Sequence, residues 1–236
     1  MKMVFTPDWF LNNDVLIGIV SFMVLFLLFL FAVKSYALNK KKSILYLGVG
    51  FFLIALGELS TILTKFVLYY DTNVTQQIGK VVMTTQLINT VDIFYSIGFF
   101  FQKFLTLSGL YLIYKIPSEK KLTGESLLIL YLLLIIALFS TSMFYVYHLT
   151  ALAILVLIVR YYYKNYKEKK LVNTKILLIA FLLLALSQAI FLLSAMNNFY
   201  VTAQGIQLVS YITLFVLITK ILLKNGKKKK PNRHNA

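Results

Sequence analysis

One uncharged apolar stretch, Val15–Val33, places the strongest constraint on how this 236-residue chain can fold. At about 1.5 Å per helical residue, it is long enough to cross the ~30 Å hydrocarbon core of a bilayer. The whole chain is 60% hydrophobic and 14% charged, which is more apolar surface than one soluble core could bury. The sequence therefore predicts an all-α polytopic membrane protein.

The remaining apolar stretches bring the total to seven predicted transmembrane helices. In residue numbers, the predicted spans are about 15–34, 43–70, 83–115, 126–140, 144–163, 175–196 and 204–223. They form one transmembrane domain over residues 1–225, and residues 226–236 are predicted to be a disordered, polybasic cytoplasmic tail. The very short connection at residues 140–142 predicts that the fourth and fifth helices are antiparallel neighbours.

Lysine and arginine residues are distributed unequally between the two sides of these spans. Of the 24, Lys2 and Lys80 fall on one side, Lys65 and Lys103 fall within spans, and all the others fall on the opposite side. Because cytoplasmic loops collect basic residues, this predicts a cell-membrane protein with its N-terminus outside and its C-terminus in the cytoplasm. The net charge of +16 then reflects topology rather than nucleic-acid binding, and the cytoplasmic face is expected to attract anionic lipid.

An internal repeat is predicted from two similar tetrapeptides. Ala55–Glu58 in the second span resembles Ala185–Gln188 in the sixth, and each follows a lysine-containing loop. With one span between two three-span units, the repeat would be a parallel 3+1+3 arrangement that places Glu58 opposite Gln188 at matched depth. The alternative is a chance match between two sequences rich in Leu, Ala and Phe.

Four ionisable residues lie within the spans, where a charge costs at least ~2.5–3.5 kcal/mol on insertion scales. They are Glu58, Lys65, Asp92 and Lys103. Because the second and third spans run antiparallel, Lys65 and Asp92 are expected to pair in the outer half. Lys103 is expected to approach Glu58 from the inner half, either directly or through water.

These charged groups are expected to line a polar cavity between the second, third, sixth and seventh spans. The predicted cavity-lining residues are Glu58, Lys65, Asn89, Asp92, Ser96, Lys103, Gln188, Gln204, Gln207 and Tyr211. The alternative is that the charged pairs neutralise each other and fix the register of two helices. Small residues in the spans are expected to mark close helix contacts, namely Gly48, Gly50, Gly57, Ala180, Ser187 and Ser194.

The sequence offers no pattern that indicates an enzyme. It contains no cysteine, two histidines, and no phosphate loop or nucleophile elbow. We therefore expect no catalytic activity, no cofactor and no metal site. The triplet Asn73–Thr75 is a candidate N-glycosylation site, because topology places it outside.

Two families of seven-helix proteins share the predicted topology. The chain resembles the microbial rhodopsins in having seven spans, an outside N-terminus and Asp92 in the third span. Its Lys220 lies at the cytoplasmic end of the last span, so retinal binding is not expected. The 3+1+3 layout is similar to that of the SWEET sugar transporters, but their Pro-Gln motifs are absent and no predicted span contains proline.

A third resemblance concerns the first two spans. The basic run Lys40-Lys41-Lys42, followed by the apolar Ser43–Leu59, resembles the seven-helix sensor regions of prokaryotic signalling proteins and related archaeal membrane proteins. It implies a receptor-like or sensory protein that binds a small polar ligand and acts on a cytoplasmic signalling partner. The runner-up is a small-solute or ion transporter that uses the same cavity, and the third reading is an assembly protein without a ligand.

Overall fold

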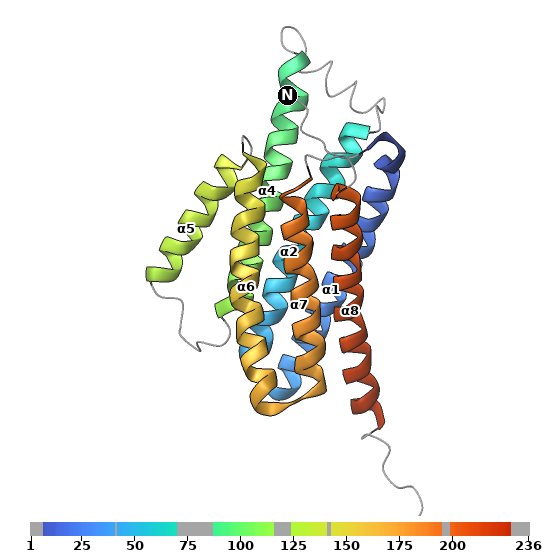
Figure 1. Ribbon diagram of the computed structural model, residues 1–236, viewed down its shortest axis with the longest axis vertical. Coiled ribbons are helices and arrows are strands. Elements are labelled where there is room, and N and C mark those ends of the chain that lie inside the picture. Colours follow the sequence, from blue (N-terminus) through green and yellow to red (C-terminus); the bar gives the residue numbers. More distant parts are fainter. Residues whose placement is uncertain are drawn as a thin grey trace, which may run out of the picture.

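The computed structural model describes residues 7–40, 42–69, 87–115, 124–140, 143–194 and 199–227. Within these residues, seven long helices follow a short 3-10 turn, and the predicted all-α, seven-helix fold is confirmed (Figure 1). The elements are η1 (Asp8–Phe10), α1 (Leu11–Asn39), α2 (Lys42–Tyr69), α4 (Leu87–Lys115), α5 (Gly124–Phe139), α6 (Phe144–Lys169), α7 (Val172–Phe191) and α8 (Phe199–Lys227).

Six of these helices are long and apolar enough to cross a membrane. Their apolar segments are Asn12–Leu38, Lys42–Phe66, Ser96–Lys115, Phe144–Lys169, Val172–Phe191 and Phe199–Leu217. The exception is α5, the predicted fourth span, because its 16 residues reach only about 24 Å. Among the described residues, six helices therefore have full membrane length, where the sequence predicted seven spans.

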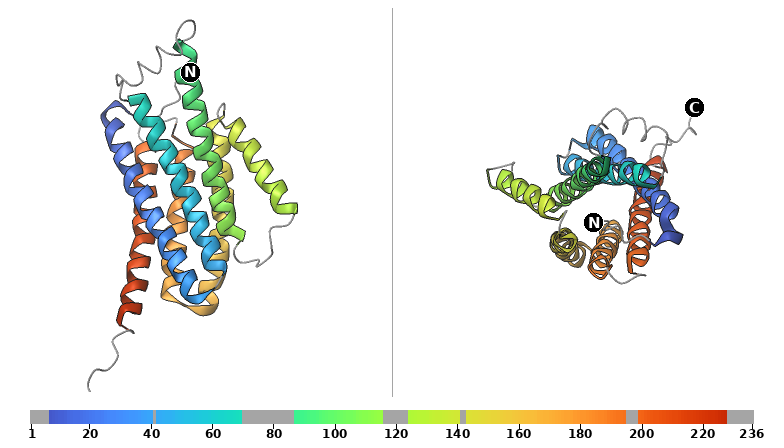
Figure 2. Two further views of the ribbon diagram at one scale, coloured as in Figure 1. Left: turned by 180° about the vertical axis from the view of Figure 1, so that it is seen from behind. Right: turned by 90° about the horizontal axis from the view of Figure 1, so that it is seen from above.

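The six long helices form a closed ring. Neighbours in the ring are α1 and α2, α2 and α4, α4 and α6, α6 and α7, α7 and α8, and finally α8 and α1 (Figure 2). The shorter α5 lies outside the ring against α4 and α6, and it runs antiparallel to α6 as predicted (Figure 1). The first three and the last three long helices are thus the two halves of the ring, and α5 connects them.

The two ends of the ring differ in charge. At one end α1, α4 and α6 finish near Lys40, Lys115, Lys169 and Lys170. We call this the basic end.

The helices α1 and α6 end with the same backbone geometry at the basic end. Lys40 and Lys170 both have a left-handed backbone, with φ of 54° and 48°, and each N–H donates to the carbonyl four residues earlier at 2.8 Å.

The outer surface of the ring is apolar, as a bilayer requires. On α5, Leu127, Tyr131 and Phe139 are 70%, 59% and 66% exposed. On the ring helices, Leu63 and Val209 are also more than half exposed. An apolar surface of this extent is stable in contact with lipid but not with water.

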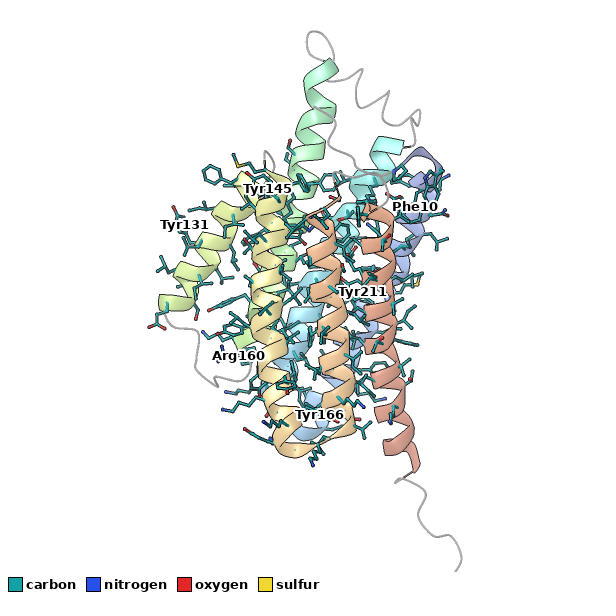
Figure 3. All side chains as sticks on the ribbon, viewed as in Figure 1. Phe10, Tyr131, Tyr145, Arg160, Tyr166 and Tyr211 are labelled. Carbon is teal, nitrogen blue, oxygen red and sulfur yellow. The ribbon has the colours of Figure 1, made fainter. Side chains whose placement is uncertain are left out.

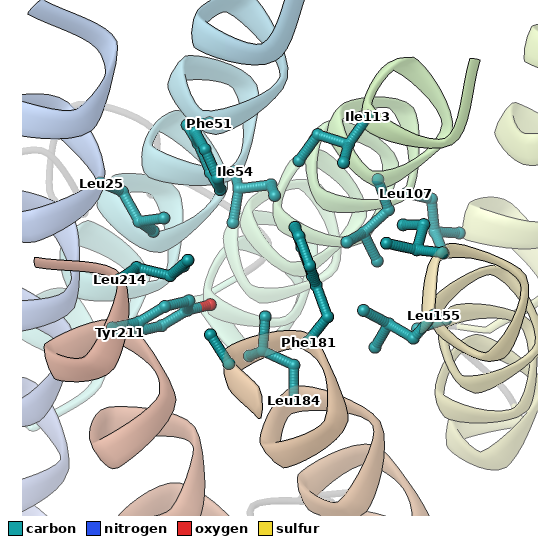
Figure 4. Close-up of a cluster of buried hydrophobic side chains, with 14 of the residues drawn as sticks. Leu25, Phe51, Ile54, Leu107, Ile113, Leu155, Phe181, Leu184, Tyr211 and Leu214 are labelled. Atoms are coloured by element: carbon teal, nitrogen blue, oxygen red, sulfur yellow. The ribbon is translucent and has the colours of Figure 1, made fainter. Parts of the chain in front are cut away.

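The interior of the ring contains a continuous apolar layer. Every ring helix contributes at least one side chain to it, and these side chains point toward one another in Figure 4. Representative members, each at most 3% exposed, are Leu25, Ile54, Leu107, Leu155, Phe181 and Leu214. This layer fills the middle of the ring with packed apolar side chains.

Glycines allow α2 and α4 to approach closely. A Cβ atom at Gly50 would lie 2.6 Å from Ile113 Cγ1 and 3.0 Å from Gly109 O. One at Gly57 would lie 2.6 Å from Thr106 Oγ1. The expectation that these glycines mark helix contacts is therefore confirmed. Gly48 acts in the same way against α1, where a Cβ would lie 2.5 Å from the Ala32 Cβ.

Candidate ligand-binding site

A buried ion pair joins α1 and α2 near the end of the ring opposite the basic end. Lys65 Nζ lies 2.7 Å from Asp14 Oδ2, and the two side chains are 5% and 0% exposed. Lys65 Nζ also donates to Tyr200 Oη at 3.0 Å and lies 5.7 Å from the centre of that ring. Tyr200 Oη in turn accepts a hydrogen bond from Gln204 Nε2 at 3.0 Å. This cluster therefore connects α1, α2 and α8.

Sequence reasoning did not include Asp14 in the site. Asp14 directly precedes the apolar stretch Val15–Val33, and that position gives no sequence signal that its side chain lies inside the bundle. The expected partner of Lys65 was Asp92. The side chains of Asn89 and Asp92 lie outside the described part of the structure, so their contribution to the site stays a prediction.

A second polar cluster lies about two helical turns deeper, between α2 and α8. Glu58 Oε1 accepts hydrogen bonds from Gln207 Nε2 at 2.9 Å and from Tyr211 Oη at 3.4 Å. Gln207 Nε2 also donates to Tyr211 Oη at 3.1 Å. Tyr211 is fully inside the bundle (Figure 3), whereas Glu58, Gln204 and Gln207 are half-buried. This cluster thus brings together three of the residues predicted to line a polar cavity, and the cluster of the ion pair contains two more, Lys65 and Gln204.

Gln188 has a partner that the sequence did not suggest. Its Oε1 lies 2.8 Å from His148 Nδ1, so it contacts α6 and not Glu58. The His148 ring stacks on Phe191 at 4.9 Å between ring centres, and Phe191 meets Tyr200 edge-on at 5.7 Å. Aromatic contacts therefore link the pair of His148 and Gln188 to the ion pair of Lys65. A single histidine near a span end gave no signal for this role.

Lys103 and Ser96 take positions different from those expected. Lys103 Nζ donates to the carbonyl oxygen of Ser140 at 2.6 Å, in the turn that follows α5. The acceptors nearest to this lysine are therefore at the end of α5, where unpaired carbonyls attract a cation. Ser96 is exposed on α4, outside the buried clusters. Another expected feature, the glycosylation triplet at Asn73, lies outside the described residues.

We predict that Lys103→Met loosens the attachment of α5 to the ring. A hydrogen bond from a charged donor contributes about 1.5–3 kcal/mol, so amide exchange in the last turn of α5 should accelerate roughly 10- to 100-fold. Hydrogen exchange with mass spectrometry on the purified protein measures this. The control is Lys220→Met, which removes an exposed lysine from α8 and should leave exchange in α5 unchanged. Unchanged exchange in Lys103→Met would contradict the role assigned to this contact.

Together, these features define the class of protein. Six apolar helices of membrane length form a ring with an apolar outer surface, so the chain is a polytopic membrane protein in contact with a lipid bilayer. Comparison with known proteins adds no closer relationship: no family model, curated protein or solved structure gives a significant match.

The polar clusters are suited to binding a small polar molecule. Together they combine two carboxylates, one ammonium group, two primary amides and two phenolic hydroxyls. The amides and hydroxyls can both donate and accept hydrogen bonds, whereas the carboxylates accept and the ammonium donates. Among the described residues, no three His, Asp or Glu side chains are grouped closely enough to hold a metal ion. The side chains around Glu58 offer hydrogen bonding and charge pairing.

Proposed function

We propose that the chain is a receptor-like or sensory membrane protein that binds a small polar ligand between α2 and α8. Glu58 would be the principal ligand contact, with Gln204, Gln207 and Tyr211 around it. Glu58, Gln207 and Tyr211 already hydrogen-bond with one another, and Gln204 hydrogen-bonds with Tyr200. Glu58, Gln204 and Gln207 also retain some accessible surface. A ligand could replace some of these contacts without leaving polar groups unsatisfied.

The distribution of polarity along the ring carries this proposal. The polar clusters of Lys65 and Glu58 lie toward the end of the ring opposite the basic end, and the apolar residues Leu25, Leu107 and Phe181 lie between these clusters and the basic end. A ligand that enters from the end opposite the basic end would meet this apolar layer and stop there. Such an arrangement favours binding and release on one side over passage through the protein.

The proposed orientation places the end of the ring that contains the polar clusters, opposite the basic end, outside the cell. Cytoplasmic ends of membrane helices collect lysine and arginine, so the basic end is assigned to the cytoplasm and the N-terminus to the outside. Lys65, Asp14 and Glu58 would then be reached from the external medium. A bound ligand would change the side-chain contacts between α2 and α8, and the basic cytoplasmic face would present that change to a signalling partner.

The parallel 3+1+3 repeat also forms part of the proposal. Glu58 and Gln188 are separated in sequence by the same interval as Lys40 and Lys170, the two left-handed helix ends. At this interval, buried positions of α2 coincide with buried positions of α7 and, for Ser194, of the turn that follows α7. The coinciding pairs are Gly48 with Leu178, Gly50 with Ala180, Phe51 with Phe181, Ile54 with Leu184, Gly57 with Ser187 and Thr64 with Ser194. Agreement in burial and in helix ends supports duplication over chance similarity.

The same repeat favours a second candidate function, a small-solute or ion transporter. Many transporters consist of repeated helical units with the substrate site at the interface between the units. Here that interface would lie between the halves α1–α4 and α6–α8, where Glu58 meets Gln207. Transport would require the apolar layer to open, whereas sensing would not.

We predict that Glu58→Gln weakens ligand binding roughly 10- to 100-fold, because a charge-assisted hydrogen bond is replaced by a neutral one. The probes are small primary amines, amino acids and polyols, screened for thermal stabilisation of the purified protein. A ligand present at 100 times its Kd stabilises the folded state by about 2.7 kcal/mol. That stabilisation should be lost in Glu58→Gln.

A matched control removes a carboxylate elsewhere. Glu125→Gln changes an exposed glutamate at the start of α5 and should leave ligand stabilisation intact. Equal stabilisation of Glu58→Gln and the unmodified protein would show that the ligand binds elsewhere. Solute flux into proteoliposomes then separates the two functions. If the unmodified protein transports a solute saturably and Asp92→Asn abolishes that transport, the sensory hypothesis is wrong and the transporter hypothesis is favoured.

A further inference from the structure

A groove at the basic end lies apart from the polar clusters, which lie toward the opposite end of the ring. It has a volume of about 550 Å³ and lies between the last turn of α4 and the outer face of α6. The side chains that define it are Tyr114 on α4 and Leu157, Arg160, Tyr163, Lys164 and Lys167 on α6. Arg160 marks its position in Figure 3.

The charges in this groove are unbalanced. Arg160, Lys164 and Lys167 follow one another at helical spacings of four and three residues, so they share one face of α6. All three are exposed, and within the described part of the chain none of them forms an ion pair. Three adjacent cations without carboxylate partners repel one another, and a bound anion would relieve that repulsion.

The order of side chains along α6 matches the structure of a phospholipid. Leu157 lies nearest the middle of the membrane-length segment, Arg160 and Tyr163 follow, and Lys167 lies about 15 Å further along the helix than Leu157. An acyl chain would contact Leu157, and the headgroup would lie beside the tyrosine and the cations. Tyrosine is enriched at this depth because its ring is apolar and its hydroxyl is polar. A soluble anion would use the cations alone.

We propose that this groove binds the phosphate-bearing headgroup of an anionic phospholipid. The planar guanidinium of Arg160 can donate two parallel hydrogen bonds to phosphate oxygens, and Lys164 and Lys167 add compact positive charges. Basic pockets between transmembrane helices bind anionic headgroups by this chemistry. Because α4 and α6 belong to different halves of the ring, the bound lipid would bridge the two halves. The proposal is independent of the ligand site at Glu58.

The test measures lipid binding by the full chain in detergent with native mass spectrometry. The unmodified protein should retain phosphatidylglycerol in preference to phosphatidylcholine. The triple variant Arg160→Gln, Lys164→Gln, Lys167→Gln should bind phosphatidylglycerol about 100-fold more weakly, at about a factor of five for each basic residue. Should the triple variant not fold, the single variant Arg160→Gln should still show about a fivefold loss.

The matched control removes the same charge from the same end. The triple variant Lys34→Gln, Lys175→Gln, Lys220→Gln neutralises three exposed lysines outside the groove and should keep most of the preference. Equal losses in the two triple variants would mean that general surface charge attracts the lipid, and the proposal would be wrong. Displacement of phosphatidylglycerol by inorganic phosphate at similar concentrations would identify a soluble-anion site instead. Retention of phosphatidylglycerol by the groove variant would also overturn the proposal.

Discussion

Replacing Lys65 with methionine is expected to destabilise the folded protein by about 3–5 kcal/mol. In the native structure the ammonium group lies 2.7 Å from the Asp14 carboxylate, and both side chains are almost inaccessible. Methionine fills nearly the same volume but carries no charge, so the buried carboxylate loses its balancing cation. The hydroxyl of Tyr200 also loses a charged donor. Unfolding in a denaturing detergent, followed by circular dichroism, measures the loss.

The double variant Lys65→Met, Asp14→Leu should recover most of this stability. Replacing both members of a buried ion pair with apolar groups is often neutral, because the cost of burying either charge disappears. A double-mutant cycle should therefore show strong coupling between the two positions. Lys34→Met is the control, since Lys34 is exposed on α1 and its loss should change stability by less than about 0.5 kcal/mol. If the double variant is as unstable as the two single losses added together, the ion pair is not the source of the effect.

The same double variant separates packing from function. If it folds well and still binds a ligand, the ion pair serves to fix the register of α1 and α2, which buried polar contacts can do. If it folds well but no longer binds, the charges of Lys65 and Asp14 belong to the ligand site together with Glu58. The comparison thus tests whether the ion pair of Lys65 and Asp14 has only a structural role or also takes part in ligand binding.

The all-α fold was largely predictable from sequence because the bilayer requires apolar stretches of this length to be helical. Val15–Val33 is apolar throughout, and any such stretch must form a helix to satisfy its backbone hydrogen bonds in lipid. The fourth predicted span is the exception. Residues 126–140 are apolar, but the helix that contains most of them, α5, has only 16 residues and is short for a membrane span. Ring closure between α8 and α1 depends on side-chain packing, and no local pattern encodes it.

The polar partners were less predictable than the polar positions. Glu58, Gln207 and Tyr211 were identified because an ionisable or amide group within a span needs an explanation. Depth along the membrane then suggested partners for the lysines, but depth fixes only one of three coordinates. It does not tell whether Lys65 turns toward α1 or α4, or whether Lys103 turns toward Glu58 or the end of α5. The rotation of each helix settles these choices, and packing determines that rotation.

Gly109→Ala is expected to destabilise the protein by about 1–3 kcal/mol, although it adds one methyl group. A Cβ at this position would lie 2.6 Å from Gly50 O and 2.7 Å from Ile54 Cγ1. A backbone carbonyl cannot rotate away as a flexible side chain can, so α2 and α4 must separate. That separation would weaken dispersion contacts along the whole crossing, where lipid supplies no hydrophobic force to hold helices together.

Gly205→Ala is the matched control for this prediction. It is the same substitution inside a helix, but apart from the neighbouring residues and backbone of α8 itself, no atom of the described residues lies within 4 Å of the position a Cβ would take at Gly205. Alanine there should leave stability unchanged or raise it by up to about 1 kcal/mol, because alanine favours the helix over glycine. Gly50→Ala should lower stability less in the Gly109→Ala variant than in the unmodified protein, because the two helices have already moved apart. Destabilisation of equal size at Gly109 and Gly205 would show that backbone approach at the α2 and α4 crossing is not responsible.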